Sequence, residues 1–379
     1  MRESDFKGTI TGEVRRVTDG SYCHFHPHDL PFDWTYSPEN LSRVNRASIE
    51  LARLDGMMRF IDDGTLEMLI SNLSLKESAS SSSIEGTRST LDDVFRSEKI
   101  EERDGWRSRD NQGIVNYRKA ILYGFERLTK GEDITMDMIR DLHRVLMQGV
   151  RSDKSPGEFK TCQNAIGMAS DTLETAKMVP ASPESVDHLI DNWLEYVNSD
   201  SIATVEKLAI SHYQFEAIHP FRDGNGRVGR LLMLMILRRD GLLRQPVLHL
   251  SGYLDSNRDR YIDLMYRVSS EDALDEWLGF ITEALEVQAR STASTVEALV
   301  RYRERLRSMV GSVNAARSVD LLFKNPYITN ADVAEGIGVS RPTAEKVIAE
   351  LEGAGIIREV TGKMRNRVYR ADGVLEILR

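Results

Sequence analysis

The spacing of apolar residues predicts a chain built mainly from helices. From about residue 37 onward, apolar side chains recur every three or four positions, which is the period of an amphipathic helix. After a first helical region at 37–128, the predicted helices are 136–148, 185–197, 205–218, 228–239, 253–268 and 272–302. The most apolar stretch, residues 231–237, is short and flanked by arginines, so it predicts a buried helix and not a membrane span.

Three segments depart from the helical pattern. Residues 1–40 are rich in Gly, Pro, His and Asp, and predict an irregular or short-stranded arm. Residues 159–179 have β-type character around Gly167 and Asp171, which predicts a hairpin. The serine run at 79–83 has two interpretations: a flexible linker, or a short helix that ends at a glycine.

Residues 23–28 contain one cysteine and three histidines, which are potential metal ligands. Alternation places the histidines on one face, and the sequence shows no second group of ligands to complete a tetrahedral site. We therefore expect a solvated arm and no metal there. His143, on an amphipathic helix, is interpreted as a packed residue and not as a catalyst.

The C-terminal residues 312–379 predict a separate small unit. Thr329 and Asp332 form a capping pair before a helix at 330–336, and Ser340 begins a second helix that runs to about Glu352. Two strands follow, at 356–360 and 366–370. Helix, turn, helix and hairpin is the order of a winged helix-turn-helix.

The charge balance limits the partners. A formal net charge of −9 argues against uniform coating of nucleic acid or of an anionic membrane. The predicted wing, residues 363–370, nevertheless carries four basic residues and no acidic one. DNA and a protein partner therefore both remain open for this unit. Two cysteines and the lack of an apolar leader at the start lead us to expect a cytoplasmic protein that does not associate with membranes.

The residues that carry chemistry lie at 218–230. Gly224 and Gly226 flank Asn225 in a turn directly before a strongly apolar helix, where free backbone N–H groups and the helix dipole favour an anion. Arg227 and Arg230 are three residues apart and therefore share a helix face. Two guanidinium groups beside a glycine turn point to a polyphosphate more than to a single carboxylate.

Two further residues complete the candidate site. The carboxylate of Asp223 can hold Mg²⁺ between phosphate oxygens. His219 lies four residues earlier and is the only plausible proton acceptor nearby. A base, a metal ligand, an anion-binding turn and two arginines predict a site for phosphoryl or nucleotidyl transfer.

The same segment resembles the signature of the Fic family, His-x-Phe-x-Asp/Glu-Gly-Asn-Gly-Arg-x-x-Arg, at every fixed position. The resemblance extends from about residue 36 to residue 268. It implies a mainly α fold, in which a Fic-type helical bundle with a small β-hairpin flap precedes the winged helix-turn-helix. The implied domains are an N-terminal arm and helical region at 1–110, the catalytic domain at 111–300 and the winged unit at 312–379.

The resemblance also implies an activity and residue roles. Most Fic enzymes transfer AMP from ATP, with Mg²⁺, to a Tyr, Thr or Ser hydroxyl of a target protein or of themselves. His219 would be the general base, Asp223 the Mg²⁺ ligand and Phe221 a core anchor. The implied nucleotide-binding residues are Gly224, Asn225, Gly226, Arg227 and Arg230 on the phosphates, and Tyr253, Asn257 and Tyr261 around the adenine.

Residues 81–86 resemble the family's inhibitory motif, Ser/Thr-x-x-x-Glu-Gly/Asn, through Ser81, Glu85 and Gly86. The resemblance implies that Glu85 pairs with Arg230 and blocks the γ-phosphate position. Three functions remain open: a self-inhibited protein adenylyltransferase, a DNA-binding regulator with a nucleotide-sensing Fic module, and a hydrolase in which Glu85 orients water to remove AMP. An intact His219 and arginine pair favour the first. A homodimer also remains open.

Overall fold

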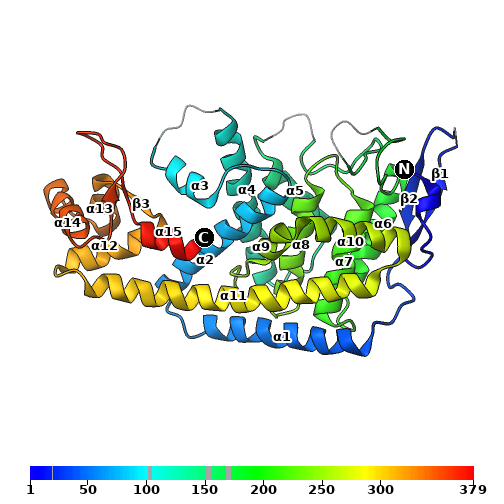
Figure 1. Ribbon diagram of the computed structural model, residues 1–379, viewed down its shortest axis with the longest axis horizontal. Coiled ribbons are helices and arrows are strands. Elements are labelled where there is room, and N and C mark those ends of the chain that lie inside the picture. Colours follow the sequence, from blue (N-terminus) through cyan, green and yellow to red (C-terminus); the bar gives the residue numbers. More distant parts are fainter. Residues whose placement is uncertain (19, 101–104, 151–154, 168–171) are drawn as a thin grey trace.

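The computed structural model describes residues 1–18, 20–100, 105–150, 155–167 and 172–379, and is mainly helical (Figure 1). The 35-residue helix α11 (Leu274–Ser308) runs along the long axis of the molecule, with α1 (Pro38–Met58) packed alongside it. Both the helical core and the C-terminal unit contact α11, so one helix connects the two parts of the chain.

The helical core surrounds α8 (Asn225–Arg239). Its central residues, from Leu231 to Leu237, are each at most 1% exposed. A helix that is apolar on all sides must be covered on all sides. The core helices, several of which pack against α8, are α2 (Asp63–Ile84), α4 (Gly105–Thr129), α5 (Met136–Met147), α6 (Val186–Asn198), α7 (Thr204–Ile218), α9 (Leu250–Ser256) and α10 (Arg258–Glu271).

The serine run lies in α2 and is not a linker. Asp62 caps the start of this helix, and its last turns bury Ser81 and Ser82 almost completely. The helix ends at Ile84 with Glu85 as its C-cap, and Gly86 follows with φ +88°, a backbone conformation that favours glycine. The helical interpretation with a terminal glycine is therefore correct, but the helix is the 22-residue α2 and not a short one. A short helix, α3 (Leu91–Ser97), follows with a capping box.

Two predicted helix boundaries are wrong. Residues 253–268 are not one helix, because the backbone breaks at Asn257, whose side-chain amide donates to the carbonyl of Tyr253. Asp272 does not begin α11, since it adopts φ +55° and its carboxylate accepts main-chain N–H groups of residues 9–11. Local helical periodicity does not report such a turn or a contact with a distant arm.

The N-terminal arm contains a two-stranded antiparallel sheet, β1 (Gly12–Arg16) and β2 (Cys23–Pro27), after the 3₁₀ turn η1 (Glu3–Asp5). The expectation of a solvated arm is wrong for β2. Phe25 is 1% exposed and its N–H donates to the carbonyl of Val179, and His24 is buried as well. Across the described residues, no three His, Cys, Asp or Glu side chains form a group able to hold a metal.

The predicted hairpin at 159–179 appears in the described residues as one antiparallel bridge, between Ile166 and Met178. Asp171, part of that prediction, lies outside the described residues. The segment continues through a second 3₁₀ turn, η2 (Pro183–Ser185), into α6. In the part of the chain that the structure describes, the helices are too short or too polar to cross a lipid bilayer.

The C-terminal unit has the predicted winged helix-turn-helix order. Its elements are α12 (Val313–Lys324), β3 (Tyr327–Ile328), α13 (Asn330–Ile337), α14 (Arg341–Gly353), β4 (Arg358–Glu359), β5 (Tyr369–Arg370) and α15 (Asp372–Leu378). The strands form an antiparallel sheet in the order β3-β5-β4. The capping box of Thr329 and Asp332 is present, whereas Ser340 precedes α14 without a side-chain capping bond.

Polar contacts join this unit to the helical core. Asn72 of α2 donates to the carbonyl of Phe323 (2.6 Å), and the Tyr327 hydroxyl donates to Asp92 of α3 (2.9 Å). A salt bridge of 2.5 Å connects Lys99 with Asp332. The winged unit therefore contacts α2, which carries Ser81, and also α3, which follows Gly86.

Candidate active site

The turn between α7 and α8 is held in shape by its own residues. Gly224 adopts φ +78° at the N-cap of α8. The Asn225 side chain accepts from the N–H of Phe221 and donates to the carbonyl of Phe221, both at 2.8 Å. Phe221 is 0% exposed, as expected of a core anchor. Since this amide is used within the turn, an anion bound here would meet the backbone of Asn225 and not its side chain.

His143 supports the turn from α5 and is packed, as predicted. Its ring stacks on Phe221 at 3.8 Å between centroids. Nδ1 accepts from the N–H of Gly157 (2.8 Å), which leaves Nε2 to donate to the carbonyl of Asp223 (3.0 Å). Burial lowers the pKa of His143 to about 4, so the ring is neutral at pH 7.

His219 is the residue directly after α7 and adopts φ +51°, with 18% of its side chain exposed. Its Nδ1 lies 3.6 Å from Oε2 of Glu216, a residue that lies before the sequence motif and is not marked by it. Burial acts to raise the pKa of Glu216, but the neighbouring His219 holds it below the ordinary value. An ionised carboxylate on this side favours the proton on Nδ1, and Nε2 is then the nitrogen that can accept one.

Arg230 lies inside the core and points toward the end of α2. It is 2% exposed, and its Nε donates to the hydroxyl of Ser81 at 2.8 Å. Its Nη2 donates to the Ser81 carbonyl (2.9 Å) and to Oε1 of Glu85 (2.7 Å). Burial opposes the charge of Arg230, but the charge of Glu85 raises its pKa above the ordinary value. The pairing implied by the family resemblance is present.

The carboxylate of Glu85 also rests on the first turn of α8. A Cβ placed on Gly226 would lie 2.3 Å from Oε1 of Glu85, so only a glycine leaves room for this contact. The start of a helix is where unpaired N–H groups and the dipole attract an anion. Glu85, with 42% of its side chain exposed, therefore occupies the position predicted for a phosphate.

Contacts along α2 fix the position of Glu85. Glu77, 1% exposed, accepts from the N–H of Ser251 at 2.8 Å and from its hydroxyl at 2.5 Å. Burial raises the pKa of Glu77 to about 7. Arg258 donates through Nε to the carbonyl of Ile84 (2.9 Å). The carboxylate of Glu85 thus comes from a helix that is bound to α9 and α10.

The residues predicted to enclose the adenine lie near the break between α9 and α10. Tyr261 is only 3% exposed, and its hydroxyl is 2.7 Å from Nε2 of His212. Tyr253 is half-buried, with its ring 5.6 Å from that of Phe280, and it accepts from Asn257 through its carbonyl. Tyr261 is therefore buried and bonded to His212, whereas Tyr253 and Asn257 are nearer the surface.

One residue of the turn, Asp223, is suited to bind a divalent cation. Oδ1 of Asp223 accepts from the N–H of Gly224 (2.8 Å), which places a carboxylate beside the start of α8. Mg²⁺ typically binds one or two carboxylates together with phosphate oxygens of the substrate. Asp223 matches that pattern, and the bound nucleotide would supply the other oxygen ligands. Arg227 lies on the same first turn, with Nη2 3.5 Å from the sulfur of Met147.

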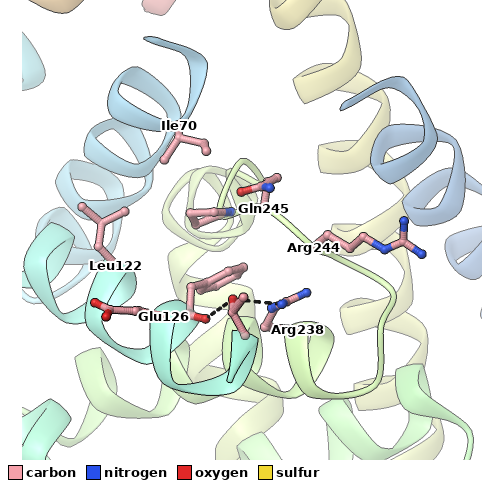
Figure 2. Close-up of a pocket in the computed structure, with 9 residues that line it drawn as sticks. Ile70, Leu122, Glu126, Arg238, Arg244 and Gln245 are labelled. Atoms are coloured by element: carbon pink, nitrogen blue, oxygen red, sulfur yellow. Dashed lines mark hydrogen bonds between the residues drawn. The ribbon is translucent and has the colours of Figure 1, made fainter. Parts of the chain in front are cut away.

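A separate cavity of about 390 Å³ lies between α4, the end of α8 and the following loop (Figure 2). It is lined by residues that include Leu122, Arg238 and Arg244, and by none of the predicted site residues. Arg238 there donates to the hydroxyl of Thr129 at 2.9 Å. The candidate active site therefore rests on the turn before α8 and not on this cavity.

Comparisons with known proteins agree with the fold and the turn. Residues 133–237 match the model of the Fic/DOC family, and residues 41–126 match the Fic/DOC family N-terminal region. A Fic family protein from Desulfovibrio desulfuricans has the same fold, with a TM-score of 0.57 at 19% identity over 89% of this chain and 97% of that one. The chain belongs to the Fic/DOC family. Its residues 319–358 also match a winged helix-turn-helix DNA-binding model, so it joins a Fic domain to a winged unit.

Curated relatives include a probable protein adenylyltransferase of Aquifex aeolicus, 31% identical over 62% of this chain and 66% of the relative. Protein adenylyltransferase fic-1 of Caenorhabditis elegans is 33% identical over 35% of this chain and 25% of the relative. A solved structure of C. elegans Fic-1 has a TM-score of 0.54 at 19% identity, over 69% of this chain and 74% of that one. The matches therefore span a quarter to about two thirds of these curated relatives.

Proposed function

We propose that this chain is a protein adenylyltransferase that transfers AMP from ATP to a Tyr, Thr or Ser hydroxyl of a target protein or of itself, and that Glu85 inhibits it. The contact of Glu85 with both Arg230 and Gly226 carries the proposal. A carboxylate at this position substitutes for one anionic group of a nucleotide. The names of the Aquifex and nematode relatives support the activity.

The residues of the turn divide the chemistry among them. Nε2 of His219 accepts the proton of the target hydroxyl, and that oxygen attacks the α-phosphorus while pyrophosphate leaves. The start of α8, with Arg227 and Arg230, holds the leaving phosphates. Asp223 would hold Mg²⁺, which would supply positive charge to offset that of the phosphates. Glu216 keeps the His219 ring in the required tautomer.

Inhibition follows from competition for Arg230. In-line attack requires the leaving pyrophosphate to lie opposite the incoming oxygen. While Glu85 occupies Arg230, the γ-phosphate lacks this partner and the nucleotide binds in a displaced position. A displacement of ~1 Å can lower the rate ~10²-fold. The inhibitor therefore affects the rate of transfer more than it excludes ATP.

Substitution of the base tests the mechanism. In a chain that carries Glu85→Gly, the added change His219→Ala should lower AMP transfer by ~10²–10⁴-fold, because a positioned base is lost. ATP affinity, measured by calorimetry, should stay within about threefold of the parent, since the phosphate contacts lie on other residues. A collapse of ATP affinity would assign His219 to binding and contradict this role.

DNA binding by the winged unit is a second proposed function. It is favoured by the match to a DNA-binding winged helix model and by the wing residues Lys363, Arg365 and Arg367, which are all exposed. Duplex DNA titrated with the full chain at two salt concentrations measures the number of phosphate contacts. Changing the three residues to Ala should reduce the slope of log K against log salt by up to about three. If the full chain does not bind at low salt, the unit is a protein-interaction module.

A further inference from the structure

We infer that Lys160 and Asn164 are positioning residues that set the orientation of His219 by binding the main chain on both sides of it. The inference rests on the proposed role of His219 as the base. Neither residue belongs to the turn signature, and both come from the segment between α5 and α6.

The two residues bind four consecutive carbonyls. Lys160 donates through Nζ to the carbonyl of Ile218 (3.1 Å) and through its main-chain N–H to the carbonyl of Pro220 (2.7 Å). The side-chain amide of Asn164 donates to the carbonyls of Phe221 (2.9 Å) and His219 (3.4 Å). Nζ of Lys160 also donates to Oδ1 of Asn164 at 3.0 Å, which links the two side chains.

The first three of these carbonyls, those of residues 218–220, need partners from outside the turn. Ile218 is the last residue of α7, and the final carbonyls of a helix have no intrahelical donor. His219 adopts φ +51°, a strained conformation for a residue other than glycine, and such residues persist only where their surroundings determine them. Pro220 has no N–H and therefore cannot donate a hydrogen bond within the turn. The linked pair Lys160–Asn164 supplies the donors that hold this conformation.

The burial of Lys160 supports a dedicated role. Its side chain is almost completely buried, at 3% exposure for the residue, although a buried amine is costly unless it is hydrogen-bonded. Both of its Nζ bonds go to the carbonyl of Ile218 and to Asn164. On the other side of the turn, Asn225 binds the same Phe221 carbonyl at 2.8 Å. The main chain that carries His219 is thus held from two directions.

The test uses the full chain with Glu85→Gly as the active parent. Lys160→Met keeps the volume of the side chain but removes its donors, and Asn164→Asp replaces the donating amide by an acceptor. We expect each to lower kcat for AMP transfer ~10²-fold while KM for ATP stays within about threefold, because the base is misplaced and the phosphate contacts remain. Lys160→Arg, which retains donors, should recover most of the lost kcat.

A matched control separates positioning from general stability. Lys207 is another fully buried lysine, and its Nζ contacts Asp240 at 2.7 Å, outside the turn. Lys207→Met should lower the melting temperature but leave kcat near that of the parent. If Lys160→Met retains the parent kcat, or if Lys207→Met loses as much, the inference is overturned.

A readout that does not depend on activity separates this inference from the proposed function. If the Glu85→Gly parent transfers no AMP, the proposed function fails and the inference is judged by NMR of the His219 ring nitrogens. Lys160→Met should then shift the ¹⁵N signals of His219, and Lys207→Met should not. Unchanged His219 signals in Lys160→Met would overturn the inference.

Discussion

Replacing Glu85 by Gln tests the competition for Arg230 without changing the shape of the side chain. The substitution removes the charge from the 2.7 Å contact with Nη2 of Arg230 and leaves a buried guanidinium with weaker partners. A hydrogen bond to a charged group contributes about 1.5–3 kcal/mol. Because 42% of the Glu85 side chain is exposed to screening solvent, we expect a smaller contribution, about 1–2 kcal/mol.

The magnitude has two measurable consequences. Without nucleotide, Glu85→Gln should melt about 1–3 °C lower, since the unfolding entropy of a 379-residue chain that unfolds as one unit is about 0.8 kcal/mol/K. With saturating ATP and Mg²⁺ this difference should disappear, because the gain in ATP binding offsets the contact that is lost. In the wild type, the γ-phosphate must displace Glu85 from Arg230, which costs the same 1–2 kcal/mol. The variant avoids most of this cost, so its ATP affinity should be about 5–30-fold higher than that of the wild type.

Thermal unfolding with and without ATP and Mg²⁺, together with calorimetry, measures both effects. Glu39→Gln is the control, because Glu39 forms an exposed contact with Arg43 within α1 and should change neither quantity. Equal ATP affinities for the wild type and Glu85→Gln would refute the competition. So would a variant that is no less stable than the wild type in the absence of nucleotide.

Three further predictions follow from buried contacts. Ser81→Ala removes the hydroxyl that accepts from Nε of Arg230 (2.8 Å) and so weakens the hold of Arg230 on the end of α2. AMP transfer in a gel-based assay should rise a few-fold above wild type, and an unchanged rate would contradict a role of Ser81 in holding Glu85. Asn225→Ala removes both 2.8 Å bonds to Phe221, so urea unfolding should show a loss of about 2 kcal/mol, and a loss below 0.5 kcal/mol would contradict the described turn. Burial lowers the pKa of His212 to about 4 from 6.5, so its neutral form stabilises the fold above pH 6.5 and this contribution is lost as the pH falls toward 4. Melting temperatures from pH 7 to pH 4 should therefore fall less steeply for His212→Gln than for the wild type, and parallel curves would contradict the shift.

The sequence predicts the turn and the buried helix after it because their signals are local. Two glycines around Asn225 and the apolar residues that follow define a turn and a buried helix wherever they occur. The contact between Glu85 and Arg230, 145 residues apart, follows instead from the family motif and is present in the structure.

Other features have no local signal. The side chains of Lys160 and Asn164 bind backbone carbonyls 55 to 58 residues away, and every residue offers such a carbonyl, so no residue type marks the partner. The alternation of β2 predicts one solvated face, but α7 packs against this strand and His24 is buried as well as Cys23 and Phe25. The serine run reads as a linker by composition, whereas tertiary burial of Ser81 makes it helical.

Intact-mass spectrometry tests the central claim most directly. The full-length wild type, Glu85→Gly, and Glu85→Gly with His219→Ala are each incubated with ATP and Mg²⁺, and the fraction of chains that carry an AMP adduct is measured. We expect a large fraction for Glu85→Gly, little for the wild type and none for the double variant. Equal modification of the wild type and Glu85→Gly would contradict inhibition by Glu85. If Glu85→Gly gained no adduct and instead lost the ability to remove AMP from a modified protein, the chain would be a hydrolase.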